Sequence, residues 1–145
     1  MKKSIRILFI VLIISLSYIV FICPPADDDV TKKLSLIGSE LKKKGFKTRY
    51  IVISRKRYKW YNDLLKTAEN SYHLKGKAID IYVWDIDGDL RFTKKDIAIL
   101  EKINSVVEKE HPELIGAFGT YTKKGGLDYF MVHIDTRGKK VRYDL

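Results

Sequence analysis

Residues 71–84 have the sequence SYHLKGKAIDIYVW, in which a polar turn leads into a β-strand. Successive side chains of a strand point to opposite faces, so Ile79, Ile81 and Val83 share one face and Asp80 belongs to the other. The aliphatic face can be buried in a core. We therefore predict a strand over 78–84 that presents Asp80 on its open surface.

Residues 130–135, FMVHID, predict a second strand with the same division of faces. Its aliphatic residues can be buried, which leaves His133 and Asp135 on the opposite side. If the two strands are neighbours, Asp80 and His133 converge. His73 lies just before the first strand and can close the set across the intervening turn.

Two imidazoles and one carboxylate suit a single catalytic zinc ion with its fourth position open. Zinc in such a site polarises a scissile carbonyl and activates water. Judged on residue types alone, the simpler interpretation is an ordinary turn histidine at His73 and a strand-end charge at Asp80.

The motifs around these residues change that balance. The pattern Ser-x-His-x-x-Gly-x-Ala-x-Asp over 71–80 resembles the first metal motif of the D-alanyl-D-alanine carboxypeptidase family. That family includes vancomycin-resistance dipeptidases and phage endolysins and shares its fold with the hedgehog signalling domain. Its second motif is similar to Gly119-Thr120-Tyr121 followed by 132–138, VHIDTRG. Arg57 and Asn62 match an upstream Arg-x-x-x-x-Asn element, so the resemblance extends over about 54–143.

The resemblance implies that His73, Asp80 and His133 are the zinc ligands. It also implies that Arg57 grips a substrate carboxylate, for which a planar fork of donors is well suited. The implied activity is a metallopeptidase of the D,D-carboxypeptidase or endopeptidase type, which hydrolyses amide bonds of peptidoglycan stem peptides or crossbridges in wall remodelling or lysis. The alternative is a non-catalytic peptidoglycan-binding domain on the same zinc fold.

One position departs from the family pattern. Several branches place an acidic residue, the general base, three residues before the second histidine, and here that residue is Phe130. Asp128 can reach the site from the loop that enters the strand, while Asp135 lies on the same strand face as His133. The position of Asp135 suits either proton transfer or orientation of a ligand. We expect Asp128 to be the base and Asp135 to orient the histidine.

The first 23 residues have a separate composition. Lys2, Lys3 and Arg6 precede an uncharged apolar run from Ile7 to Cys23, which suits a signal anchor or a signal peptide. The cations favour export of the chain after Cys23, and the lack of a small-x-small pattern before Pro24 favours an uncleaved anchor. We expect residues 1–23 to be this anchor or signal peptide, 24–30 a linker, and 31–145 a zinc peptidase domain outside the cytoplasm.

The formal net charge is +10, from 28 basic and 18 acidic residues. A basic exported domain suits an anionic envelope, and export argues against nucleic acid as a partner. Cys23 is the only cysteine, so no internal disulfide can form. The expected protein is a monomer that binds peptidoglycan peptides and is attached to the membrane by its N-terminal segment.

Helical spacing or capping predicts helices over 31–44, 59–68 and 93–110, and a β-rich run predicts a further strand over 49–54. This mixed order favours an α+β fold with a small antiparallel sheet flanked by helices, preceded by an N-terminal transmembrane helix. The resemblance implies that the fold is hedgehog-like, or DD-peptidase-like.

A calcium loop is the remaining motif. Asp85, Asp87 and Asp89 stand at positions 1, 3 and 5 of such a loop, with Asp96 at position 12. Leu90 occupies position 6, where glycine is required for a sharp turn. We therefore favour a polar strand-to-helix connection over a calcium site.

Overall fold

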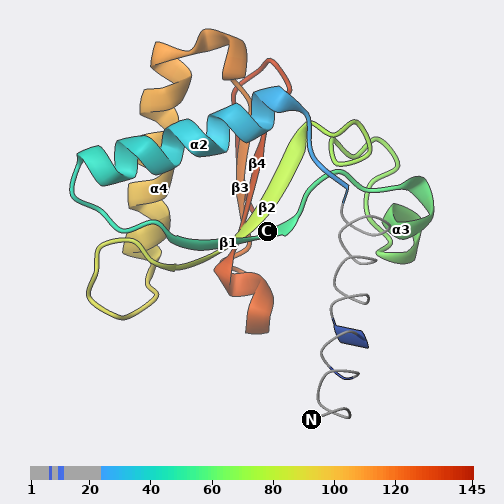
Figure 1. Ribbon diagram of the computed structural model, residues 1–145, viewed down its shortest axis with the longest axis horizontal. Coiled ribbons are helices and arrows are strands. Elements are labelled where there is room, and N and C mark those ends of the chain that lie inside the picture. The colour runs from blue at the N-terminus through green and yellow to red at the C-terminus, as the bar shows by residue number, and fades with distance from the viewer. Residues whose placement is uncertain (1–6, 8–9, 12–23) are drawn as a thin grey trace.

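The computed structural model describes residues 7, 10, 11 and 24–145 and has an α+β fold with a small mixed sheet flanked by helices (Figure 1). The strands lie in the order β1-β2-β4-β3-β5. The elements are α2 (Asp28–Lys43), β1 (Arg49–Ser54), α3 (Lys59–Leu64), β2 (Ala78–Asp85), α4 (Lys94–Glu110), the 3₁₀ helix η1 (Pro112–Leu114), β3 (Ala117–Thr120), the 3₁₀ helix η2 (Gly126–Phe130), β4 (Met131–Asp135) and β5 (Val141–Asp144).

The sheet is mixed and not antiparallel as predicted. β1, β2, β4 and β3 pair antiparallel, but β5 pairs parallel with β3. After β4 the chain passes across β3 to its free edge, and its direction there matches that of β3. Neither β3 nor β5 was predicted from the sequence, and each has only four residues.

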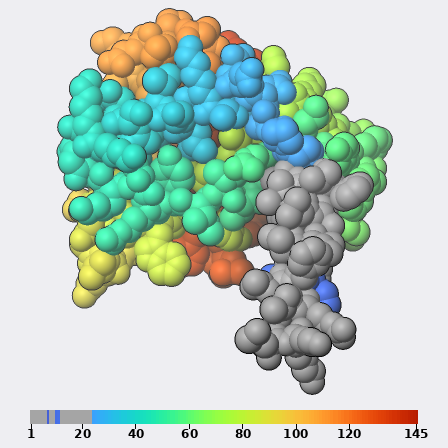
Figure 2. Space-filling view, in the orientation of Figure 1, coloured from blue at the N-terminus to red at the C-terminus, as the bar shows by residue number. Residues whose placement is uncertain are grey.

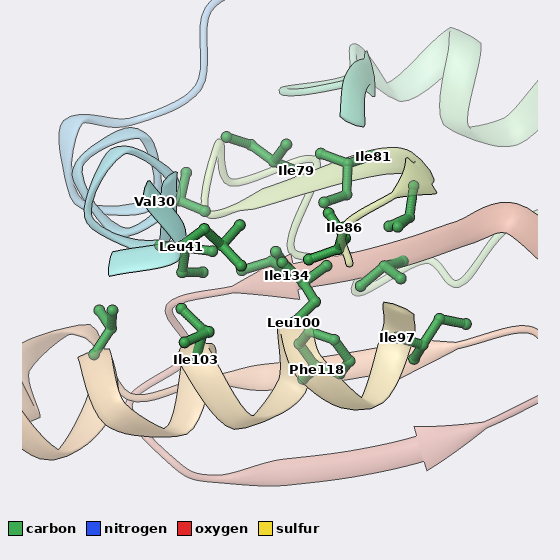
Figure 3. Packing of buried hydrophobic residues seen from close by; sticks show 14 residues of the cluster. Val30, Leu41, Ile79, Ile81, Ile86, Ile97, Leu100, Ile103, Phe118 and Ile134 are labelled. Carbon is green, nitrogen blue, oxygen red and sulfur yellow. The ribbon is translucent and has the colours of Figure 1, made fainter. Parts of the chain in front are cut away.

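The two strands that carry the predicted ligands are adjacent. β2 and β4 pair antiparallel, with Asp80 directly opposite His133 and Ile81 opposite Val132. The aliphatic residues of both strands pack against α2 and α4 in one core, shown in Figure 3. The opposite face of the sheet, which we call the open face, therefore carries Asp80 and His133.

The helices follow the sequence with two changes. α4 begins with the predicted capping box, in which Thr93 and Asp96 bond reciprocally to each other's backbone amides. α2 begins at Asp28, inside the stretch expected to be linker, and acidic residues in its first turn suit the helix dipole. α3 ends at Leu64, earlier than predicted, because the following turn is bonded to Asn62 through Thr67 and Ala68.

The predicted membrane anchor, residues 1–23, lies outside the described residues except for residues 7, 10 and 11. Within the described ranges, no helix has the length and apolar character needed to cross a membrane.

A buried lysine connects the helices to the sheet. The side chain of Lys33 on α2 is fully buried and donates to the carboxylate of Glu108 on α4 at 2.8 Å. It also donates to the backbone carbonyl of Asp135 on β4 at 2.9 Å. Glu108 is bonded in addition to Arg142 of β5 at 2.6 Å. Burial lowers the pKa of Lys33, and the Glu108 carboxylate opposes that effect.

We predict that Lys33→Met lowers the free energy of unfolding by about 3 kcal/mol, because the charge of Glu108 then loses one of its buried partners. The neighbouring Lys32 pairs with Glu113 at an exposed position, so Lys32→Met is the matched control and should cost under about 1 kcal/mol. Urea unfolding followed by circular dichroism measures both. Equal losses of unfolding free energy in the two variants would show that the buried pair stabilises the fold no more than the exposed pair does.

Candidate metal centre

Three side chains meet on the open face of the sheet. The Asp80 carboxylate oxygen Oδ1 lies 2.8 Å from Nδ1 of His133 and 3.1 Å from Nε2 of His73. The two ring nitrogens are 3.3 Å apart. All three residues are buried, and they form a group that could bind a metal ion.

The far side of each imidazole has a backing acceptor. Nδ1 of His73 is 2.6 Å from the carbonyl oxygen of Arg55, and Nε2 of His133 is 3.3 Å from Oδ2 of Asp135. Both partners accept hydrogen bonds, so each of these nitrogens carries the proton of the ring. When the rings are neutral, the inward nitrogens carry lone pairs that can coordinate a cation. Without a cation, a second proton on the His133 ring lets Nδ1 donate to Asp80 instead. Backing of this kind fixes the ring orientation of metal-binding histidines.

Hydrogen bonds and nearby charges determine the ionisation of Asp80 and His133. Burial would raise the pKa of Asp80, but hydrogen bonds with His133 and His73 outweigh it and hold the pKa well below its usual range. Burial would lower the pKa of His133, yet bonds with Asp135 and Asp80 raise it. The carboxylate therefore stays ionised, which is the form that coordinates a cation.

The structure places Arg57 beside the cluster. Its Nη2 donates to Oδ2 of Asp80 at 2.5 Å, and its Nε donates to the hydroxyl of Ser54 at 2.8 Å. The side chain is about one-tenth exposed. Arg57 thus orients Asp80 and holds a positive charge at the rim of the cluster. Asn62, from the same Arg-x-x-x-x-Asn element as Arg57, is buried, and its side-chain amide donates to the carbonyl of Ala68 in the turn after α3.

Asp135 lies behind His133, on the side away from Asp80. Its carboxylate accepts hydrogen bonds from the Ala117 amide at 2.6 Å and from the Arg137 side chain at 2.7 and 2.5 Å, besides the contact with His133. Burial would raise the pKa of Asp135, but the bonds from His133, Arg137 and Ala117 hold it well below the usual range. A buried and fully bonded carboxylate orients the histidine and is poorly placed to take up a substrate proton.

Asp128 lies in η2, on the segment that precedes β4, and is half-buried. It is not part of the three-residue cluster. Asp128 and Asp80 nevertheless share a neighbour, Tyr121. Burial raises the pKa of Tyr121, and the negative charges of Asp80 and Asp128 raise it further. Phe130, three residues before His133, packs against Phe92 with ring centroids 4.6 Å apart.

Two tyrosines stand next to the cluster, and neither was singled out from the sequence as a functional residue. Tyr143 of β5 has its ring centroid 6.2 Å from that of His133 and 6.4 Å from that of Tyr121. Burial raises the pKa of Tyr143, and the neighbouring Tyr121 raises it further, so its hydroxyl remains protonated. A Cβ on Gly119 would meet the Tyr143 ring at 2.1 Å, so glycine is needed there. The Gly-x-Tyr motif, Gly119 to Tyr121, was the feature of the sequence that could have indicated these tyrosines.

An apolar groove of about 950 Å³ lies on the sheet next to this site. It begins at Tyr82, two residues from Asp80 on the same face of β2, and continues to Trp84. Its walls come from β1, β2, the 85–92 loop and η2, through Arg49, Tyr50, Ile51, Tyr82, Val83, Trp84, Leu90, Phe92, Leu127 and Phe130.

The acidic loop after β2 brings Asp85, Asp87 and Asp89 together. Asp85 is buried and pairs with Arg49, and Asp87 pairs with Lys95 at 2.7 Å. Leu90 nevertheless makes the sharp turn expected only of glycine, with φ at 67°. The turn is therefore not the obstacle to calcium that the sequence suggested. The cationic partners of Asp85 and Asp87 are what a calcium ion would have to displace.

Neither a family model, nor a curated protein, nor a solved structure matches this chain. Its function must therefore be inferred from the geometry of the site and from the motifs themselves.

We predict that the purified protein binds about one divalent metal ion, and that His133→Ala abolishes this binding because it removes one of three ligands. His111 lies outside the cluster and pairs with Glu113 at the surface, so His111→Ala is the matched control and should keep the metal. Metal content by mass spectrometry and titration calorimetry measure the effect. Metal retained in His133→Ala would exclude this site.

We predict that Asp135→Asn weakens metal binding about 10-fold to 100-fold, since His133 loses the charged partner that orients its ring. Competition with a chelator of known affinity measures the change. Circular dichroism of the metal-free variant serves as the control for folding, because Asp135 also holds the Ala117 amide. Unchanged affinity in a folded variant would contradict the orienting role.

Proposed function

We propose that this chain is a zinc-dependent peptidase that hydrolyses amide bonds of peptidoglycan peptides. The observation that carries the proposal is the convergence of three ligand atoms within 2.8–3.3 Å of one another. Two imidazole nitrogens and an ionised carboxylate face one another in a buried site, so they offer a cation three donor atoms at one point. Two histidines and one carboxylate are the donor set of a catalytic zinc, whose fourth position is taken by water or substrate.

Zinc, when bound, supplies a Lewis acid that polarises a carbonyl and makes water reactive near neutral pH. The chain supplies the remaining functions. Asp135 and the Arg55 carbonyl hold the two imidazoles in the orientation needed for binding. Arg57 keeps a positive charge at the rim and, through its remaining donors, can hold the carboxylate of a peptide substrate.

The substrate class follows from the motifs. The two segments that resemble the metal motifs of D-alanyl-D-alanine carboxypeptidases lie more than fifty residues apart and meet at one point of the sheet. This meeting is what the hedgehog-like fold of that family requires. The positive charge of the chain suits the carboxylates of peptidoglycan and an envelope location. We place the domain outside the cytoplasm, anchored by its N-terminal segment.

The best candidate for the general base is Asp128. Asp135 is saturated by Arg137 and Ala117, and Phe130 has no ionisable group. Asp128 is partly accessible, and its charge acts on Tyr121 together with that of Asp80. A base must reach a proton of the reacting water without being a metal ligand, and the segment that carries Asp128 follows Gly125 and Gly126, which give it freedom to approach.

A second candidate function is non-catalytic binding of wall peptides on the same zinc fold. The saturation of Asp135 and the presence of Phe130 at the family's base position favour it. In this version the metal and Arg57 hold a carboxylate ligand, and no bond is cut. Turnover distinguishes the two functions, because both require the metal.

Digestion of purified sacculi by the full chain in detergent micelles tests the proposal. We expect soluble muropeptides whose masses identify the bond that is cut. His133→Ala should release none, and His111→Ala should release the wild-type amount, because only the former loses a ligand. Saturable binding of muropeptides without release of products would establish the second candidate function. Neither binding nor release, in protein that holds zinc, would contradict both.

We predict that Asp128→Asn keeps zinc but lowers the turnover rate about 10²-fold or more, within the range for loss of a general base. The amide retains the size of the side chain and cannot accept the proton. Steady-state rates on a muropeptide, together with zinc content, measure the two properties separately. Full activity of Asp128→Asn would show that Asp128 is not the base. The control is Tyr129→Phe, a change at the next residue of η2, which should keep the wild-type rate.

A further inference from the structure

The segment around α3 exposes an unusual amount of apolar surface. Tyr58, Trp60, Leu64 and Leu65 are 43%, 53%, 69% and 43% exposed, although all four lie within eight residues of one another. Two basic residues, Lys56 and Lys66, flank them along the chain, and Lys59 between them pairs with Asp63 at 2.8 Å. Clustered exposed apolar side chains mark an interaction surface. We call Tyr58–Leu65 the α3 surface.

The residue before the α3 surface, Arg57, and the residue before α2, Asp27, are bonded to the same loop, 73–76. The backbone amide of Asp27 donates to the carbonyl of Gly76 at 2.9 Å, and the amide of Arg57 donates to the carbonyl of His73 at 2.9 Å. A Cβ on Gly76 would meet the Asp27 side chain at 2.4 Å, so the two segments touch closely. Figures 1 and 2 show residues 24–30, in blue, and the green α3 region at the same side of the molecule.

The chain that precedes Pro24 contains the uncharged apolar run from Ile7 to Cys23. Residues 24–27 reach at most about 14 Å when extended. Pro24 is buried and Asp27 is bonded to Gly76, so this connection is not a free linker. If the apolar run enters a bilayer, the loop 73–76 lies within that reach of the lipid, and the α3 surface begins one residue after Arg57, which is bonded to that loop.

We propose that the α3 surface docks on the bilayer beside the point where the chain enters it. Aromatic side chains with flanking lysines are the composition that favours the boundary between headgroups and acyl chains. Lys56 and Lys66 add attraction to anionic lipids. This inference rests on the apolar N-terminal run and does not require catalysis, so it stands or falls separately from the proposed peptidase activity.

The apolar groove is the competing surface. It also exposes large side chains, with Trp84 and Leu127 71% and 72% exposed. However, Trp84 lies about 20 Å along β2 from Ala78, at the end of the strand away from Gly76. A four-residue connection pinned at Gly76 brings the α3 surface to the lipid more readily than the groove.

The two tryptophans of the chain, Trp60 on the α3 surface and Trp84 in the groove, make the test direct. The full chain is reconstituted in nanodiscs that contain phosphatidylglycerol, as two variants, W84F and W60F, each with one tryptophan. We expect brominated lipid to cause a loss of Trp60 emission and aqueous iodide to leave it unchanged. Trp84 should show the reverse pattern.

Exposed leucines provide the matched variants. Leu64→Asp in the chain that retains Trp60 should abolish the loss of emission caused by brominated lipid, whereas Leu127→Asp should leave it unchanged. Both residues are about 70% exposed, so neither change should unfold the protein, and circular dichroism checks this. Trp60 that responds to iodide and not to brominated lipid would overturn the proposal. Lipid quenching of Trp84 alone would assign the docking to the groove. Failure of the chain to enter nanodiscs would also overturn the proposal.

Discussion

The pairing of β2 with β4 is the constraint on which the rest of the structure depends. Backbone hydrogen bonds between these strands set Asp80 opposite His133, and the same register turns Ile81 and Val132 into the core. A slip of one residue would exchange the two faces of a strand, so it would bury His133 among aliphatic residues and expose Val132. The requirement to bury the aliphatic face and the requirement to assemble three ligands are therefore met by one register. The hydrophobic effect therefore fixes the position of the candidate metal centre.

The parts of this arrangement that obey a short sequence period were predictable. The alternation in 78–84 and 131–135 indicated both central strands, and the capping box at Thr93 indicated the start of α4. Together they predicted that Asp80 and His133 share a surface. The ligand set itself came from the motifs, since histidine and aspartate alone have many other uses.

The features that could not be predicted depend on contacts between distant segments. β3 and β5 are too short to show a period, so the parallel pair and the place of Tyr143 beside His133 were missed. The buried pair of Lys33 and Glu108 was not predicted, because nothing local indicates that these side chains of two different helices meet. The contact between the Arg57 guanidinium and Asp80 was not predicted either. These positions depend on contacts between residues far apart in the sequence, which the local sequence pattern does not predict.

The hydrogen bond between Asp27 and Gly76 gives the molecule a definite response to mechanical load. Tension applied to the chain ahead of Pro24 passes first to this bond, before it reaches the core beneath Val30. Gly76 belongs to the turn that also positions His73 through the Arg57 amide. A pulling force on the N-terminus would therefore distort the ligand loop before it unfolds the domain, because a single backbone hydrogen bond yields before a packed core does.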